Sequence, residues 1–354
     1  MESVEAVQWM KEQGIYDAAL TRYGILKRVF TECLAVTSEK VLIIGDVGEN
    51  GRQVAPIIAG AYYLAAQELN IEANFLLQGV CSRSHDASPE VQTALKELGR
   101  NSVVILSMSD KLGNLNYPSF RHFCQKFGHR FVSALSLGDL STSQVNEVIE
   151  PMDINYKIMQ PQLSKLREML NDAEEIAVKT KNGTDFLFNI KGCEAILSDG
   201  LYLNPGQGGN LPAGEVFIPP NGKRVEGKIV IDGSSSNHRG TTIIKDMITL
   251  TVEDGSVAKI EGGEEAKRLE QAFDWAATLA KNPGAIRRIA ELGFGFNPKA
   301  RIIGSAVVDE KALGTSHVGI GSNHWFGGSI YATTHFGQIF REPIIKVDGK
   351  KINL

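Results

Sequence analysis

Four short apolar runs that alternate with helical segments constrain the fold of this chain more than any other feature. The first run, at residues 40–44, is continuous and β-prone, which is typical of strands buried on both faces of a sheet. Three similar runs follow it at residues 73–77, 102–106 and 130–134. Helical segments, predicted at about 54–69, 89–99 and 118–127, lie between the runs. This alternation predicts an α/β domain with a parallel sheet.

The pattern changes near residue 160. A helix predicted at roughly 160–172 leads into strand-like runs at 175–179 and 185–190, and the K-N-G-T sequence between them is typical of a hairpin. Further short strands are predicted at 227–232, 246–252 and 256–261, with one long helix at about 264–280. At 354 residues the chain exceeds what one core usually fills. We therefore predict a Rossmann-like α/β domain over residues 1–160 and a β-rich α+β domain over residues 161–354.

Charge and composition exclude several classes of partner. The net charge is −4 and no basic cluster interleaves with aromatic residues, so a small molecule or peptide is expected as partner rather than nucleic acid. The four cysteines include no C-x-x-C pair, which argues against a zinc ribbon and a disulfide framework. The N-terminus lacks an apolar signal region, and the longest uncharged run, residues 53–67, is too short to span a bilayer. These features predict a cytoplasmic protein that does not bind membranes.

A glycine-rich turn follows the first predicted strand, in the position where nucleotide-binding loops begin. The spacing of Gly45, Gly48 and Gly51 is not G-x-G-x-x-G, and no Walker lysine follows. Asp46 and Glu49 would also repel a phosphate. A tight strand-to-helix turn is the simpler interpretation, and no nucleotide cofactor is expected.

Carboxylates and imidazoles gather beside glycines in the last quarter of the chain. Glu291 follows a helical stretch predicted at 283–290, where the helix dipole disfavours a carboxylate and so favours a charged partner such as a metal ion. His317 follows Glu310 by seven positions. Two further histidines, His324 and His335, lie within 18 positions after His317. Because carboxylates and imidazoles together suit divalent zinc, cobalt, manganese or iron, the pattern indicates a metal site.

Several short motifs in the second half of the chain belong with these residues. They are G-T-D at 183–185, L-P-A-G-E-V-F at 211–217, V-E-G at 225–227, D-E-K at 309–311, G-T-S-H at 314–317, and G-G at 327–328 with His335. Together they resemble the motifs of the aminopeptidase T family, the M29 metallopeptidases. The resemblance implies an α/β N-terminal domain, a β-rich catalytic domain holding two divalent ions (zinc, cobalt or manganese), and a homodimer.

The same resemblance implies a role for each candidate residue. Glu215 and Glu291 would bind metal, Glu310 would bind metal or act as the catalytic base, and His317 and His335 would be metal ligands. The ions would lower the pKa of a shared water and polarise the peptide carbonyl, while a carboxylate passes the proton to the leaving amine. The implied activity is that of a metallo-aminopeptidase, which removes N-terminal residues from peptides.

One departure from the family pattern affects the expected ligand set. The family has an aspartate two residues after the last histidine, whereas this chain has Gly337. His324 or Asp309 could supply a replacement ligand. Alternatively, one metal position is lost and the site holds a single ion.

The chain also resembles, more distantly, the dihydroxypyridine ring-cleaving dioxygenases, which use one iron ion held by two histidines and a carboxylate. His317, His335 and Glu310 could form such a set. Metal-dependent aminopeptidase is therefore the leading prediction. The alternatives are a mononuclear non-haem iron dioxygenase related to 2,5-dihydroxypyridine dioxygenase, and an inactive family member that binds a peptide or metabolite.

Overall fold

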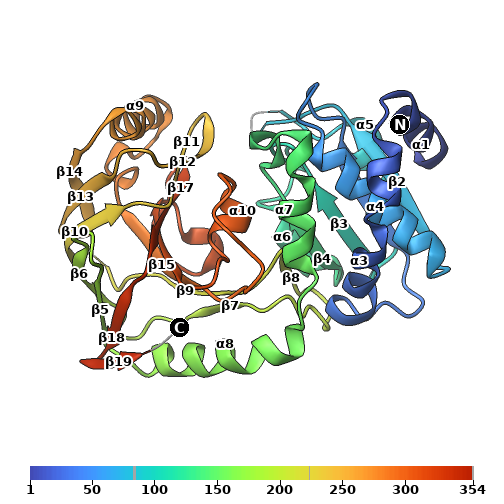
Figure 1. The fold of residues 1–354 in the computed structure, drawn as a ribbon. Helices are drawn as coiled ribbons and strands as arrows, with labels where there is room; N and C mark the ends of the chain where they lie inside the picture. Colours follow the sequence, from blue (N-terminus) through green and yellow to red (C-terminus); the bar gives the residue numbers. More distant parts are fainter. Residues whose placement is uncertain (83–84, 223, 353–354) are drawn as a thin grey trace. The chain divides into compact units, whose positions relative to one another are not determined.

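The chain forms two compact units in the computed structural model, which describes residues 1–82, 85–222 and 224–352 (Figure 1). Unit 1 comprises Met1–Tyr156 and Gly200–Ala213, and unit 2 comprises Lys157–Asp199 and Gly214–Leu354. Residues 200–213 are thus the exception to a division of the chain near residue 160. They belong to unit 1 because the strand that they contain pairs with its sheet.

Unit 1 contains a five-stranded parallel sheet in the order β2-β1-β3-β4-β8. The strands are β1 (Val41–Asp46), β2 (Ala73–Gln78), β3 (Val103–Ser107), β4 (Arg130–Ala134) and β8 (Gly208–Asn210). Every residue of β1, β3 and β4 is buried, as expected for strands covered on both faces. The predicted α/β domain with a parallel sheet is confirmed.

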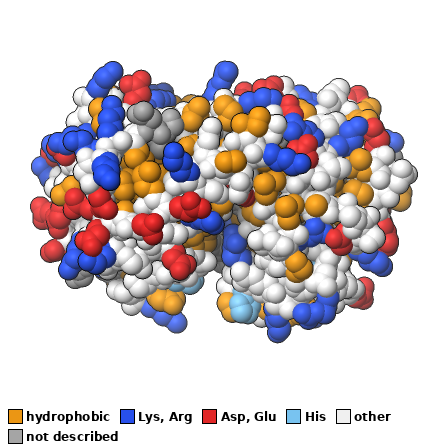
Figure 2. Space-filling model, turned by 90° about the horizontal axis from the view of Figure 1, so that it is seen from below, with side chains coloured by type: hydrophobic (Ala, Val, Ile, Leu, Met, Phe, Trp, Pro, Cys, Tyr) orange, Lys and Arg blue, Asp and Glu red, His pale blue; other side chains and the backbone are white. Residues whose placement is uncertain are grey.

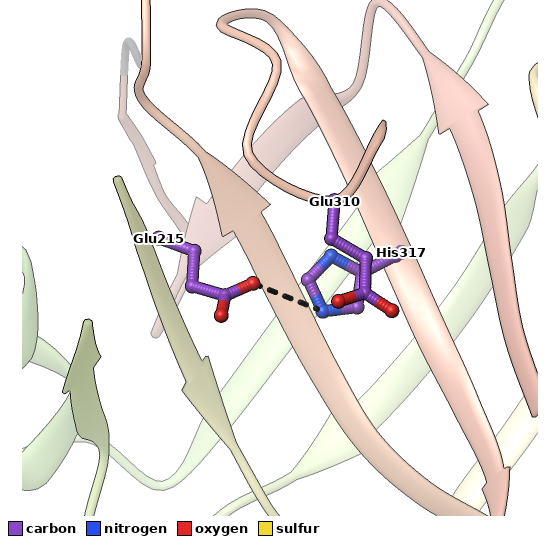
Figure 3. A group of neighbouring side chains, drawn as sticks. All are labelled: Glu215, Glu310 and His317. Atoms are coloured by element: carbon purple, nitrogen blue, oxygen red, sulfur yellow. Dashed lines mark ion pairs between the residues drawn. The ribbon is translucent and has the colours of Figure 1, made fainter. Parts of the chain in front are cut away.

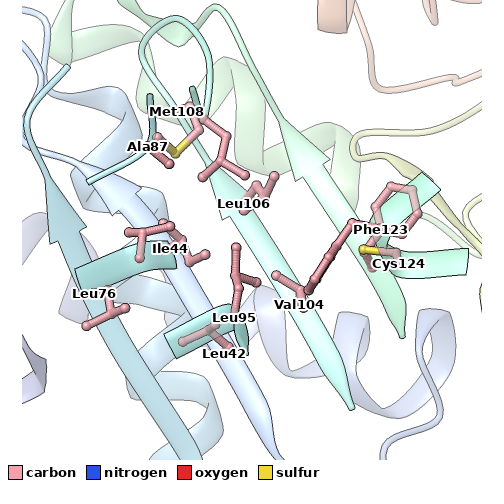
Figure 4. Close-up of a cluster of buried hydrophobic side chains, with 13 residues drawn as sticks. Leu42, Ile44, Leu76, Ala87, Leu95, Val104, Leu106, Met108, Phe123 and Cys124 are labelled. Carbon is pink, nitrogen blue, oxygen red and sulfur yellow. The ribbon is translucent and has the colours of Figure 1, made fainter. Parts of the chain in front are cut away.

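A hydrophobic core lies between one face of this sheet and the helices α5 (Pro89–Glu97) and α6 (Phe120–Phe127) (Figure 4). The buried strand residues Leu42, Ile44, Leu76, Val104, Leu106 and Phe131 pack with Val91, Leu95, Phe123 and Cys124 from the helices. Serine caps fix where both helices begin: the hydroxyl oxygens of Ser88 and Ser119 accept hydrogen bonds from the backbone N–H groups of Val91 and His122. These helices and strands therefore form one continuous core.

The other helices of unit 1 are mostly short. They are α1 (Ser3–Glu12), α2 (Tyr16–Leu20), α3 (Tyr23–Arg28), the π-helical turn η1 (Val29–Cys33), α4 (Val54–Glu68), α7 (Val145–Ile149), and the 3-10 turns η2 (Leu137–Asp139), η3 (Thr142–Gln144) and η4 (Glu150–Met152). The long α8 (Tyr156–Asn171) begins at the last residue of the first segment of unit 1.

Unit 2 contains two antiparallel sheets of seven strands each, which confirms the predicted β-rich C-terminal domain. One has the order β14-β13-β10-β6-β5-β18-β19, with β5 (Glu175–Lys179), β6 (Asp185–Asn189), β10 (Val225–Ile231), β13 (Ile248–Glu253), β14 (Ser256–Glu261), β18 (Ile344–Val347) and β19 (Lys350–Ile352). The other has the order β12-β11-β17-β16-β15-β9-β7, with β7 (Ile196–Ser198), β9 (Glu215–Ile218), β11 (Ser234–Asn237), β12 (Gly240–Ile243), β15 (Ile289–Gly295), β16 (Thr315–Gly321) and β17 (His335–Arg341). The helices that lie wholly in unit 2 are α9 (Glu264–Leu279), α10 (Ala306–Asp309), and the 3-10 turns η5 (Pro283–Ala285) and η6 (His324–Phe326).

The prediction of a helix at 283–290 is wrong, and so is the prediction that Glu291 lies at a helix end. Only the turn η5 is helical, and Glu291 lies inside strand β15. All seven residues of β15 are buried, and the strand pairs with β16 on one side and β9 on the other. Pairing with two sequence-distant strands outweighs the local propensity here.

The surface carries charges of both signs. Figure 2 shows lysine and arginine side chains scattered among acidic and uncharged ones on the face that it presents. None of the helices within the described residues combines the length and apolarity needed to cross a bilayer.

Candidate metal centre

Four of the five predicted site residues lie on neighbouring strands of the second sheet of unit 2. Glu215 is on β9, Glu291 on β15, His317 on β16 and His335 on β17, which are adjacent in that order. Directly opposed residues of an antiparallel pair point to the same face, as do alternate residues of a strand. The register therefore directs all four side chains to one face of the sheet.

Three glycines on the central strands leave room for these side chains above the sheet. A Cβ atom on Gly293 would overlap the imidazole of His317, and one on Gly319 would overlap His335 and approach Cγ of Glu291 to 2.8 Å. A Cβ atom on Gly337 would lie 2.7 Å from Oε1 of Glu310. Because these glycines have no side chains, the functional groups pack directly against the backbone of the sheet.

Glu310 reaches the site from the segment that follows α10. This segment packs on the end of β15, where a Cβ atom on Gly295 would overlap the carbonyl oxygen of Ala312. The backbone N–H of Asn297 donates to the carbonyl of Lys311 at 2.7 Å, and Leu313 donates to the carbonyl of Asn297 at 3.1 Å. Close backbone packing therefore sets the position of Glu310 and of the residue after it.

Asp309 anchors the same segment. Its fully buried carboxylate accepts hydrogen bonds from the backbone N–H groups of Ile303, Gly304 and Ser305 at 2.7 to 3.1 Å, and from the hydroxyl of Ser234 at 2.6 Å. Burial raises the pKa of Asp309 to about 6, although these four donors oppose the shift. Because both oxygens already accept hydrogen bonds, the structure places Asp309 as a support of the loop.

His324, the other candidate for a replacement ligand, lies in an exposed turn. Its Nδ1 is 2.7 Å from the hydroxyl oxygen of Ser322, and its ring stacks on that of Tyr331 with the centroids 4.7 Å apart.

The predicted residues form one connected cluster, of which Figure 3 draws Glu215, Glu310 and His317. Nε2 of His335 lies 3.1 Å from Oε1 of Glu291, and Nε2 of His317 lies 3.8 Å from the same oxygen. Nε2 of His317 also lies 3.9 Å from Oε2 of Glu215, and these two side chains face each other in Figure 3. Glu215, Glu310 and His317 each offer a ligand atom within 4.8 Å of the others. The structure therefore brings all five residues together.

Lys311, which the sequence did not mark as a site residue, is also part of the cluster. Its ammonium lies 2.8 Å from Oε1 of Glu215 and 3.0 Å from Oε2 of Glu310, and its side chain is 0% exposed. Its position in a D-E-K motif carries no signal of this role, because only the packing of the loop decides where the side chain points.

Burial and the neighbouring charges shift the pKa values of these side chains. Burial raises the pKa of Glu215, even though Lys311 opposes the shift. Burial would also raise the pKa of Glu310, but Lys311, His317 and His335 outweigh it and lower that pKa. The pKa of Lys311 is raised because both carboxylates outweigh its burial, and Glu291 likewise outweighs burial to raise the pKa of His335 to about 9.

Two buried carboxylate oxygens of the cluster suit a cation. Within the described residues, Oε2 of Glu215 and Oε2 of Glu291 have no hydrogen-bond partner. A buried acceptor without a partner is costly, so it calls for an ion or water. Ligand atoms sharing one ion at bond lengths of about 2.1 Å lie about 3 to 4 Å apart. The separations from Nε2 of His317 to Oε2 of Glu215 and to Oε1 of Glu291, 3.9 and 3.8 Å, fall in that range. The residues therefore fit a divalent metal ion.

An aromatic group borders the cluster. The rings of Trp325 and Phe326 lie edge-on to His335, with centroids 6.0 and 6.5 Å from the imidazole. Phe326 also packs against Phe217 of β9 at 5.2 Å, whereas Trp325 is 44% exposed. A partly exposed aromatic face thus stands beside one of the histidines.

Comparison with known proteins gives a family model described as 2,5-dihydroxypyridine 5,6-dioxygenase, which matches residues 22–353. The 2,5-dihydroxypyridine 5,6-dioxygenase of Pseudomonas putida is 24% identical over 220 residues, which are 58% of this chain and 61% of that relative. The match thus spans about three-fifths of the relative's length.

Two solved structures share the fold over nearly the whole chain. The 2,5-dihydroxypyridine dioxygenase of Pseudomonas putida KT2440 has a TM-score of 0.68 at 19% identity, and the match covers 97% of this chain and 95% of that one. AmpT from Thermus thermophilus has a TM-score of 0.60 at 15% identity, with 98% of each chain covered. At these identities both likenesses show the fold, including the fold relation to aminopeptidase T that the motifs indicated.

Proposed function

Because the chain belongs to the 2,5-dihydroxypyridine 5,6-dioxygenase family, we propose that it is a metal-dependent dioxygenase that opens a hydroxylated aromatic ring. The observation that carries the proposal is the group of His317, His335 and Glu291 on three adjacent strands, in which His317 and Glu291 are buried. Two imidazoles and one carboxylate are the ligand set of non-haem iron oxygenases. A bound iron ion would supply the chemistry by which dioxygen reacts with the ring.

The geometry favours Glu291 over Glu310 as the carboxylate of this set. Oε1 of Glu291 lies within 3.8 Å of Nε2 of both histidines, whereas Oε2 of Glu310 is held by Lys311. Glu215 would add its unpartnered Oε2. Such a set needs no ligand from Asp309 or His324.

Glu310 is the carboxylate best placed to handle a proton. Its side chain is 16% exposed, compared with 6% for Glu215 and Glu291, which makes it the most accessible of the three carboxylates. Its lowered pKa keeps it ionised at neutral pH. Glu310 would therefore accept the proton of a ring hydroxyl as the substrate binds.

Peptide hydrolysis, the leading prediction from the motifs, is the second candidate. The observation in its favour is the number of buried glutamates, because carboxylates suit the hard divalent ions of hydrolases. The family match supports ring cleavage better than it supports hydrolysis. The expected homodimer belongs to the same resemblance and would be tested by sedimentation.

The deciding experiment is an oxygen-uptake assay on protein purified without chelator. With Fe²⁺ and 2,5-dihydroxypyridine, we expect oxygen consumption matched by loss of the substrate's absorbance, stopped by a chelator and restored by Fe²⁺. The variant His317→Ala should lose at least about 100-fold in rate, because even partners of metal ligands typically contribute 10- to 100-fold.

Two other results would contradict the proposal. Release of amino acids from aminoacyl chromogenic substrates with Co²⁺ or Mn²⁺, lost in Glu215→Gln, would identify a peptidase. Substrate binding without turnover under either condition would identify a binding protein.

Trp325 is expected to bind the ring of the substrate. An aromatic pair contributes about 0.5 to 1.5 kcal/mol, so Trp325→Ala should raise KM about 2- to 12-fold. Because the side chain would act only in binding, kcat should change little. Steady-state kinetics with Trp275→Ala as control checks this, since Trp275 is 42% exposed on α9. An equal rise in both variants would contradict the assignment.

A further inference from the structure

The ammonium of Lys311 is buried between two carboxylates inside a cluster that fits a metal ion. It contacts Oε1 of Glu215 at 2.8 Å and Oε2 of Glu310 at 3.0 Å, and no part of its side chain reaches solvent. A buried ammonium is tolerated only when opposite charges surround it. The protein has therefore built a fixed positive charge into the site.

Lys311 contacts a carboxylate that is placed to bridge two cations. In paired-metal sites the ions lie about 3.5 to 4 Å apart and share carboxylates between them. Glu215 has this bridging arrangement, because Oε1 contacts Lys311 while Oε2 points toward Nε2 of His317. One oxygen of Glu215 thus faces a cation that is part of the chain, and the other is left for a cation from solution.

The charges of the cluster lead to the same conclusion. Glu215, Glu291, Glu310 and Lys311 together carry a net charge of −2 when the histidines are neutral. One divalent ion neutralises this buried charge, whereas two divalent ions would leave an excess of two positive charges. Uncompensated buried charge is strongly unfavourable in either direction.

Glu310 and Gly337 complete the arrangement. Oε1 of Glu310 lies over Gly337, in the space that a side chain there would fill, while Oε2 holds the ammonium. Position 337 therefore offers no ligand of its own, and the carboxylate above it is committed to Lys311. While the ammonium is present, it takes up the carboxylate oxygens of Glu215 and Glu310 that a second divalent ion would need on this side of the cluster.

We infer that Lys311 serves as a built-in cation in one of two cation positions, so that the site accepts a single divalent ion beside His317, His335, Glu291 and Oε2 of Glu215. The inference rests on the metal dependence of the proposed function, but not on the reaction. Lys311 acts here as a positioning residue, which orients Glu215 and Glu310.

The test is the number of Co²⁺ ions bound per chain, measured by equilibrium dialysis and elemental analysis. We expect one ion in the wild-type protein and two in Lys311→Met, whose unbranched side chain ends one atom short of the ammonium and carries no charge. Lys259→Met is the control, because it removes an exposed lysine paired with Glu261 at 2.7 Å, and it should bind one ion. If Lys311→Met does not fold, Lys311→Asn takes its place, since an amide can still donate to a carboxylate.

Two ions or none in the wild-type protein, or equal counts in the wild-type protein and the lysine variant, would overturn the inference. The same measurements test the proposed function independently of the role of Lys311. One bound ion without oxygen uptake would refute the dioxygenase proposal and leave the role of Lys311 standing, whereas two bound ions with oxygen uptake would do the reverse.

Discussion

Replacing Gly293 with alanine is expected to lower the affinity for a divalent metal ion by at least about 100-fold, the upper end of what disturbing a metal ligand's surroundings costs. The new methyl group would overlap Cε1 and Nε2 of His317, and Nε2 is the ring nitrogen that faces Glu215 and Glu291 and would bind the metal. His317 is 1% exposed, so the packed interior leaves the ring no space to move aside. Overpacking should also lower the free energy of unfolding by about 1 to 3 kcal/mol.

Calorimetric titration with Co²⁺ and urea unfolding would measure the two effects of Gly293→Ala. Gly284→Ala is the matched control, because a Cβ atom there meets only an ordinary contact, 3.6 Å from the side chain of Asn282. Unchanged metal affinity in Gly293→Ala would show that His317 does not bind the ion.

In metal-free protein, Lys311→Met is expected to lower the free energy of unfolding by about 3 to 5 kcal/mol, the usual cost of removing one partner of a buried ion pair. Among the described residues, Lys311 is the only cationic side chain that forms an ion pair with Glu215 or Glu310 at 3.0 Å or less, and the variant removes it. Divalent metal should restore much of the loss, because ions that bind only the folded protein stabilise it.

Urea unfolding in chelator and in excess Co²⁺ would measure the effect of Lys311→Met. The double variant Lys311→Met/Glu310→Gln separates charge from packing, since it also removes one of the stranded carboxylates and should be less destabilised than Lys311→Met alone. A loss of stability equal in both variants and indifferent to metal would attribute the effect to packing.

The core of unit 1 could be predicted because its strands carry their own signal. Strands β1 and β3 are buried on both faces and so appear as continuous apolar runs. Strand β8 carries no such signal, because its sequence is G-G-N and its partner β4 lies more than seventy residues earlier. A pairing of this kind depends on tertiary contacts, which local sequence does not encode.

The sequence predicted which residues gather at the candidate site better than it predicted the strands and the loop that carry them. Motifs pointed to five acidic and histidine residues; the sheet order brings four of them together, and the segment after α10 adds Glu310. The strand that carries Glu291 was missed because its glycines suppress the β signal, although one of them, Gly293, makes room for the imidazole of His317. Lys311 was missed because the direction of a loop side chain has no sequence pattern.

The pairing of β8 with β4 affects how the chain folds during synthesis. Domains generally fold in order from the N-terminus as they leave the ribosome. Here the first 156 residues emerge with β4 as an open sheet edge, a surface prone to pair with other chains, until residues 208–210 arrive to cover it. The nascent N-terminal unit must therefore wait for part of the next unit to be translated, and it exposes that edge to chaperones or to neighbouring nascent chains in the interval.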